Sequence, residues 1–294
     1  MDSEVLGEAS YIRMIRSILS KGDLQQTRNG NTYSLFGAQM RFSLENDRIP
    51  LLTTKKVAWK TCLKELLWFI SGSTDNETLQ KQNVHIWDRN ADRAFLDSQG
   101  FYTRAQNDLG PIYGHQWRHY NASYEDCKTN YTGKGVDQLQ EVIDALKDPD
   151  KRSSRRIIMS AWNPIQTKEM ALPPCHVVSQ FYVNSDRELS CALYQRSGDM
   201  GLGVPFNIAS YSFLTHLLAK HCGLVAKEFV HFIGNAHVYE EHIAALTEQI
   251  TREIHEPPKI QVLGNHDAIE DYTVDDFKIE AYTHHGPLSM LMKP

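Results

Sequence analysis

The segment "ELSCALYQRSGDMGLGVPFNIASYSFLTHLLAKHCG", Glu188–Gly223, predicts a strand, a loop and a long helix in immediate succession. Its first ten residues have the aromatic and apolar content of a strand, and glycines at 198, 201 and 203 would let a backbone approach a ligand closely. Residues 207–223 have helical spacing and end at a glycine. The strand therefore ends by delivering polar side chains into a glycine-rich loop, namely Gln195, Arg196, Ser197 and Asp199.

Similar patterns predict further elements on both sides of this segment. Helical spacing of apolar residues indicates helices at 11–22, 58–72 and 136–149. Strands are indicated at 155–164, 177–185 and 229–239, with an interruption at Gly234 in the last and a tight hairpin at 184–188. Residues 91–131 predict a surface excursion that contains a compact turn at 108–117. This order predicts an α+β fold with one mostly buried sheet.

Composition favours one continuous soluble domain over residues 1–294, with a flexible N-terminus at about 1–10. The formal net charge of −5 disfavours a protein built to grip nucleic acid through its backbone. The five cysteines have no zinc-ribbon or C-x-x-C spacing, which favours reduced thiols in a cytosol-like compartment. The N-terminus lacks the pattern of a signal or transit peptide, and no apolar run is long enough to cross a membrane.

Cys175 in "LPPCHVV" is the first candidate for chemistry. A free cysteine in a strand is usually a buried core residue, but Pro173 and Pro174 would hold this strand start still. Successive strand residues point to opposite faces, so a dyad of Cys175 with His176 has poor geometry. A nucleophilic Cys175 would need a cation from elsewhere in the chain.

Arg196 supplies such a cation, and with Ser197 it offers donors that suit a phosphate. An ordinary turn with solvated polar residues is the alternative for this stretch. Asn207 precedes the apolar helix and suits an N-cap. Its carboxamide could instead read a uracil edge, since it both donates and accepts, whereas cytosine reverses that pattern.

Other polar residues allow two interpretations each. Arg155 and Arg156 form either a solvated charge run or an anion contact, and Arg28 lies in a predicted turn. Glu65 is either exposed or a buried acid with a raised pKa that could shuttle protons. The histidines near 115 and 237 lack convincing ligand partners, so no metal site is expected.

Several long motifs resemble the thymidylate synthase family. They are "ALPPCHVVSQFYV", "LSCALYQRSGDMGLGVPFNIASYSFLTHLLA", "DLGPIYGHQWRHY" and "RRIIMSAWNP", and the likeness runs from about Tyr11 to about Thr283 in the family's order. The excursion near residue 100 resembles the longer eukaryotic-type version. The resemblance implies a three-layer α/β fold around a large mixed sheet, whose sheet faces form a homodimer.

The resemblance also implies reductive methylation of dUMP at C5 by a methyltransferase. The co-substrate would be 5,10-methylenetetrahydrofolate, which gives both the carbon and the hydride, without a metal or a nicotinamide. Cys175 would attack C6 of the uracil. Residues implied in catalysis are Cys175, Glu65, Asn90, Tyr113, His176, Arg196 and Asp199. Glu65, Asn90, Tyr113 and His176 would order water for proton transfer.

The substrate sites follow from the same resemblance. Residues implied in dUMP binding are Arg28, Gln195, Arg196, Ser197, Asp199, Asn207, His237 and Tyr239, with Arg155 and Arg156 reaching in from the partner subunit. Residues implied in folate binding are Ile86, Trp87, Asn90, Asp199, Leu202, Gly203 and Phe206. Residues 284–294 would form a closing C-terminal tail. A cytoplasmic location is expected, with the nucleus or a host cell's cytoplasm as alternatives.

Three departures from the family pattern bear on these expectations. The loop around Arg28 is one residue shorter than usual, Asn235 stands where an aspartate is common, and the chain ends "LSMLMKP". They predict a changed loop, a small shift in sugar affinity and altered closure. A dCMP or hydroxymethyl-transferring relative, a non-catalytic paralogue and a cysteine hydrolase are alternatives, and RNA binding beside catalysis stays open.

Overall fold

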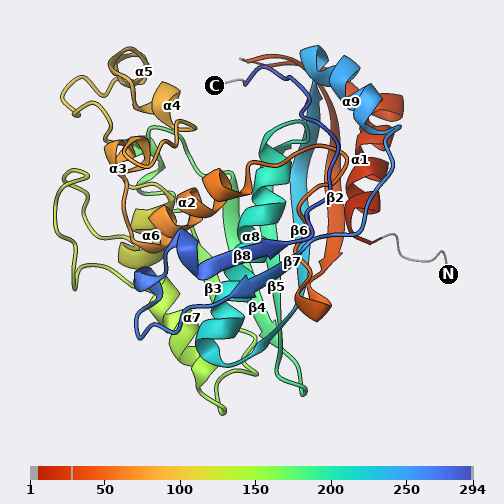
Figure 1. The fold of residues 1–294 in the computed structure, drawn as a ribbon. Coiled ribbons are helices and arrows are strands. Elements are labelled where there is room, and N and C mark those ends of the chain that lie inside the picture. The colour runs from red at the N-terminus through yellow and green to blue at the C-terminus, as the bar shows by residue number, and fades with distance from the viewer. Residues whose placement is uncertain (1–5, 28, 293–294) are drawn as a thin grey trace.

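A six-stranded mixed sheet organises the fold (Figure 1). The computed structural model describes residues 6–27 and 29–292. The strand order is β1-β2-β6-β5-β4-β3, in which only β5 and β6 run parallel. The strands of this sheet are β1 (Asp23–Thr27), β2 (Gly30–Ser43), β3 (Ile158–Ser160), β4 (His176–Val183), β5 (Glu188–Asp199) and β6 (Val225–Tyr239).

Helices, α8 (Gly203–Cys222) among them, cover one face of the sheet, and β7 (Lys259–Val262) pairs with β8 (Phe277–Glu280) in a separate two-stranded sheet. The α-helices are α1 (Glu8–Lys21), α2 (Trp59–Ile70), α3 (Asn76–Gln80), α4 (Asp88–Ala91), α5 (Arg93–Ser98), α6 (Tyr113–His119), α7 (Gln138–Lys147), α8 (Gly203–Cys222) and α9 (Ile243–Gln249). Mixed α/β architecture with a large mixed sheet is therefore confirmed.

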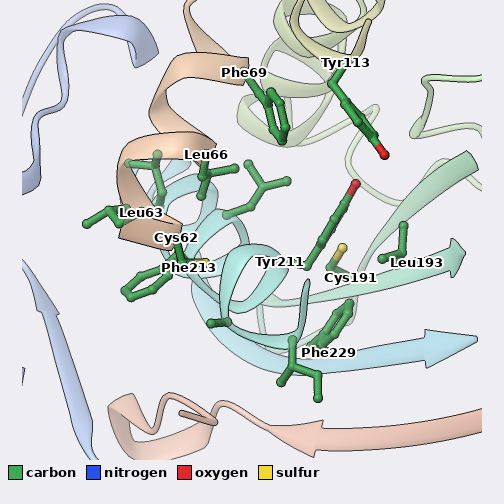
Figure 2. Close-up of a cluster of buried hydrophobic side chains, with 14 of the residues drawn as sticks. Cys62, Leu63, Leu66, Phe69, Tyr113, Cys191, Leu193, Tyr211, Phe213 and Phe229 are labelled. Carbon is green, nitrogen blue, oxygen red and sulfur yellow. The ribbon is translucent and has the colours of Figure 1, made fainter. Parts of the chain in front are cut away.

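Helix α8 is the connection that makes β5 and β6 parallel neighbours, because parallel strands need a long crossover. Most of its residues are buried, since it packs on β5 and β6 and is itself covered by α2. In Figure 2, Tyr211 lies on the side of α8 that faces Phe229 of the sheet, and Phe213 lies on the other side of α8, near Cys62 of α2. The result is a sheet layer, a central helix and an outer helical layer.

Several sequence predictions are wrong in detail. Strand β5 continues through Asp199, so residues 195–199 belong to a strand and not to a loop. Helix α8 starts at Gly203, which places Asn207 inside the helix instead of at its N-cap. Both errors arose because glycines were taken as loop signals, although Gly198 is a paired strand residue opposite Ala236.

The remaining errors concern two strands, whose limits depend on pairing with distant segments, and two helices. Strand β2 was not predicted, although it pairs with most of β6. Residues 155–164 form only the three-residue strand β3, and residues 113–119 form the buried helix α6 instead of a turn. Helix α1 begins at Glu8, three residues before its predicted start at 11, and the Glu8 carboxylate accepts the Thr53 and Thr54 amides at 2.7 and 2.8 Å.

Gly234 does not interrupt β6, contrary to the prediction, but allows two strands to meet beside the candidate site. A Cβ at Gly234 would lie 2.8 Å from the carbonyl oxygen of Arg196, which is backbone and cannot move aside cheaply. The glycine is therefore required by the close packing of β6 against the backbone of β5.

We predict that Gly234→Ala destabilises the protein by about 1–3 kcal/mol, because the added methyl group overpacks the β5–β6 contact. Thermal unfolding followed by calorimetry measures the change. Gly286→Ala is the matched control, since a Cβ there meets no atom within 4 Å. Equal stability of the two variants would contradict the steric argument.

Candidate active site

Cys175 lies directly before β4 and has its backbone held on both sides. Its N–H donates to the Tyr113 hydroxyl at 2.7 Å, and its carbonyl accepts the Arg196 N–H at 2.9 Å. The Arg196 guanidinium donates to the carbonyls of Pro174 and Pro173 at 2.8 and 3.0 Å. The antiparallel pairing of β4 with β5 thus brings together the cysteine and the cation that the sequence predicted.

Electrostatics at Cys175 have two opposing parts. Burial raises the pKa of the thiol, and the positive charge of Arg196 opposes that increase. His176 does not supply a base, because burial lowers its pKa to about 3, against an opposing side-chain hydrogen bond with Asn207. Its ring packs between Tyr113 and Tyr211, with centroids 5.1 and 5.2 Å away. A Cys175–His176 dyad is therefore unsupported, as expected from strand geometry.

A pocket of about 400 Å³ lies where β5, β6 and the β1–β2 hairpin meet. Four predicted site residues line it: Arg196, Ser197, His237 and Tyr239. Sequence reasoning missed four further polar lining residues: Gln25, Thr27, Asn29 and Thr32. Asn235, which the sequence singled out for its effect on sugar affinity, also lines the pocket. The polar hairpin residues were a usable signal, but only its pairing with β6 shows that the hairpin borders this pocket.

Asn235 contacts the neighbouring histidine directly. Its side-chain oxygen lies 3.1 Å from Nδ1 of His237, which places the ring proton on Nδ1 and leaves Nε2 as an acceptor. Burial lowers the pKa of His237 against the opposing charge of Asp199. His237 is therefore a neutral group with a defined tautomer on the pocket wall. Arg28 lies outside the described residues, between the lining residues Thr27 and Asn29.

A second group of predicted residues surrounds the buried end of α2. Burial raises the pKa of Glu65 to about 7, although the Trp87 Nε1–H donates to its carboxylate at 2.7 Å and opposes the shift. The Asn90 side-chain nitrogen is buried and has no hydrogen-bond partner in the described structure. Burial raises the pKa of Tyr113 and keeps its hydroxyl protonated. Glu65 thus has the raised pKa that one of the two sequence interpretations expected.

The predicted folate residues Asp199, Leu202, Gly203 and Phe206 lie together at the β5–α8 junction. The Asp199 carboxylate accepts the Gly201 N–H at 2.8 Å and lies 3.6 Å from Nδ1 of His242. Lys55, which sequence reasoning missed, donates to the Gly201 carbonyl. Burial lowers the pKa of Lys55 to about 8, against the opposing charge of Asp199. The Lys55 ammonium group thus stabilises the β5–α8 junction through its hydrogen bond to the Gly201 carbonyl.

The C-terminal segment lies against the same region. The Leu291 carbonyl accepts a hydrogen bond from His242 Nε2 at 2.8 Å, and the Met292 carbonyl accepts one from Arg89 at 3.0 Å. Arg89 is in α4, next to the predicted folate residue Asn90 and close in sequence to Ile86. The last two residues, 293 and 294, lie outside the described part of the chain.

Arg155 and Arg156 are exposed just before β3, and neither lines the pocket of its own chain. Among the described residues, no group of three or more histidine, cysteine or acidic side chains could hold a metal ion. A search of the same residues finds no helix that is both long and apolar enough to cross a membrane.

Comparison with known proteins gives these residues a common context. The family model described as thymidylate synthase matches residues 9–293. The chain belongs to the thymidylate synthase family. Family membership supports thymidylate synthase function for the chain, as the sequence motifs predicted.

Three relatives illustrate the similarity. The chain is 53% identical over 288 residues to human thymidylate synthase, which covers 97% of this chain and 90% of that protein. It is 49% identical over 302 residues to the Saccharomyces cerevisiae thymidylate synthase, with 99% of each chain covered. It is also 51% identical over 287 residues to the Zea mays bifunctional dihydrofolate reductase-thymidylate synthase, of which the match covers 54%.

We predict that Glu65 titrates near pH 7 and that Trp87→Phe raises its pKa by about one unit, since the lost N–H had stabilised the carboxylate. Carbon-13 NMR of labelled glutamate measures the midpoint. Trp68→Phe is the control, because the Trp68 indole donates to the Asp75 carbonyl instead. A midpoint near the ordinary glutamate value in the parent protein would refute the burial argument.

Proposed function

We propose that this enzyme transfers and reduces a one-carbon unit at C5 of dUMP. The co-substrate is 5,10-methylenetetrahydrofolate and the products are dTMP and dihydrofolate, which makes the protein a methyltransferase. The proposal rests on the position of Arg196. Its hydrogen bonds to the Cys175 and Pro174 carbonyls hold it beside Cys175, and its side chain also lines the polar pocket. One cation can therefore hold the substrate phosphate and favour the thiolate.

The pocket residues divide between the phosphate and the sugar of dUMP. Arg196 and Ser197 hold the phosphate, with Arg28 as a further ligand. His237 and Tyr239 hydrogen-bond the 3′-hydroxyl, and the acceptor Nε2 of His237 suits a hydroxyl donor. Asn207, whose side-chain oxygen accepts the Gln195 amide at 2.9 Å, reads the uracil edge.

The proposed reaction begins at C6 of the uracil ring. The Cys175 thiolate adds to C6, and the electron pair moves toward C5 and O4 as an enolate. One of the two C–N bonds of the folate methylene group breaks to give an iminium ion, C5 attacks that iminium carbon, and C5 then loses its proton. Departure of tetrahydrofolate leaves an exocyclic methylene. Hydride transfer from the folate to that carbon releases Cys175, restores the C5–C6 double bond and leaves dTMP with dihydrofolate.

Glu65 supports the proton transfers, because a carboxyl with a pKa of about 7 both gives and takes protons at neutral pH. Asn90, Tyr113 and His176 order water around O4 and C5. The unpartnered amide of Asn90 supports this role, since a buried donor without a partner is costly until a ligand or water pairs with it.

The folate binds over the β5–α8 junction. Asp199 accepts hydrogen bonds from the pterin ring, while Ile86, Trp87, Leu202, Gly203 and Phe206 line the site. The contacts of residues 291 and 292 with His242 and Arg89 support closure of the C-terminal segment over this place.

We further propose a homodimer in which the outer faces of two sheets pack together. The face of the sheet opposite α8 exposes large apolar side chains, which an isolated chain would leave in water: Ile158, Tyr182, Tyr194 and Phe232. Arg155 and Arg156 border this face next to Ile158 and reach the partner's phosphate site. One continuous buried core supports a single domain, and five free cysteines suit a reducing, cytoplasmic location.

The proposal is tested by incubating the purified protein with dUMP and methylenetetrahydrofolate under reducing conditions and following dihydrofolate formation. We expect turnover by the parent protein and a loss to background in Cys175→Ser, because a serine hydroxyl is not ionised near neutral pH. Cys127→Ser is the control for loss of a thiol elsewhere. Turnover of dCMP alone would overturn the assignment of uracil as the base.

Mixing Arg155→Ala chains with Cys175→Ser chains tests the shared site. Each heterodimer has one site with an intact Cys175 and an intact arginine from its partner. Random reassociation should therefore restore about a quarter of the parent activity, since half of the dimers are mixed and each has one working site. Absence of any recovery in dimers shown to have exchanged subunits would refute the shared site.

A further inference from the structure

His231 is a buried residue that the reaction scheme does not use. It lies on β6 opposite Leu193 of β5 and Met40 of β2, and its side chain is fully buried beside the Phe229 ring. Its Nε2 lies 2.8 Å from the side-chain oxygen of Gln195. Its Nδ1 is buried and has no hydrogen-bond partner in the described structure.

The hydrogen-bond directions around Gln195 follow from one backbone group. The Ser197 carbonyl can only accept, and it lies 2.8 Å from the Gln195 amide nitrogen. The Gln195 oxygen therefore faces His231, so Nε2 of His231 must carry the ring proton. Burial, together with a smaller effect of the nearby His176, lowers the pKa of His231 to about 3, which keeps the ring neutral with one proton.

The same directions extend to Asn207. The second N–H of Gln195 points at the Asn207 side-chain oxygen, 2.9 Å away. The Asn207 oxygen is thereby held on the Gln195 side, and its NH₂ group is turned away from Gln195. If the Asn207 amide were flipped, its NH₂ group would face the NH₂ group of Gln195, and two donors would meet. A flip of Gln195 as well would relieve that contact. It would, however, set the Gln195 oxygen against the Ser197 carbonyl and the Gln195 NH₂ group against the His231 N–H.

We propose that His231 is a positioning residue for base selectivity, which it exerts by fixing the amide orientation of Gln195 and, through it, that of Asn207. This inference rests on the proposed role of Asn207 in reading the uracil edge. An NH₂ group turned toward the base favours the O4 acceptor of uracil over the amino donor of cytosine. The base selectivity is thus set by a buried histidine that contacts neither the nucleotide nor the folate.

Two substitutions separate this role from simple packing. His231→Leu removes the donor and leaves Ser197 as the remaining restraint on Gln195, while His231→Gln replaces the donor at a similar distance. His216→Leu is the matched control, because His216 is also buried and its Nε2 lies 2.8 Å from the Arg48 carbonyl, outside the site. The control loses a comparable buried hydrogen bond without touching Gln195.

The measured quantity is the ratio of dUMP to dCMP binding, from calorimetry with each nucleotide, together with the ratio of their kcat/KM values. We expect His231→Leu to lower the ratio about tenfold, in line with the loss of one buried hydrogen bond. His231→Gln should restore most of it, and His216→Leu should leave it unchanged. An unchanged ratio in a folded His231→Leu protein would overturn the inference.

Nitrogen-15 NMR of labelled histidine tests the same inference in the parent protein, so it does not depend on variants that fold. We expect His231 to be neutral with its proton on Nε2 from pH 5 to pH 9. A proton on Nδ1 would refute the orientation of Gln195. Failure of the parent to turn over dUMP would instead count against the proposed function, which keeps the two failures distinct.

Discussion

The parallel pairing of β5 with β6 is the constraint on which the rest of the molecule depends. Parallel neighbours require a crossover, and the buried helix α8 supplies it. The pairing places Asp199 opposite His237, while the β5–α8 junction brings Asn207 beside Gln195. Because these residues come from three consecutive elements, one connection sets both the polar pocket and the junction beside it.

Burial then decides the charge of the groups that this arrangement gathers. His176, His231 and His237 have lowered pKa values, so their rings are neutral. Hydrogen bonds define the tautomers of His231 and His237. The same effect raises the pKa of Glu65 into the neutral range. Arg196 keeps its charge, and its contacts with the two proline carbonyls hold it beside Cys175. Fixed polar groups of this kind stabilise developing charge without reorganising.

Local pattern predicted the longer helices well, missed short ones such as α6, and predicted the strands unevenly. Helices α1, α2 and α7 have a strong helical period that needs no distant partner to be recognised. Strand β2 and the short β3 depend on pairing with segments far away in sequence, so their limits could not be read locally. Glycines misled the prediction at 198 and 234, where they serve close strand packing instead of a turn.

The sequence by itself determined the family and the functional side chains available for chemistry, because long motifs are local properties. It also argued against a Cys175–His176 dyad, because strand alternation is a local property too. Only the tertiary structure decided which polar residues meet, as with Gln25 and Thr27 at the pocket and Lys55 behind the junction. It also decided which groups are charged. Desolvation and hydrogen-bond direction depend on neighbours in space, and the chain supplies those neighbours from positions as far apart as Lys55 and Gly201.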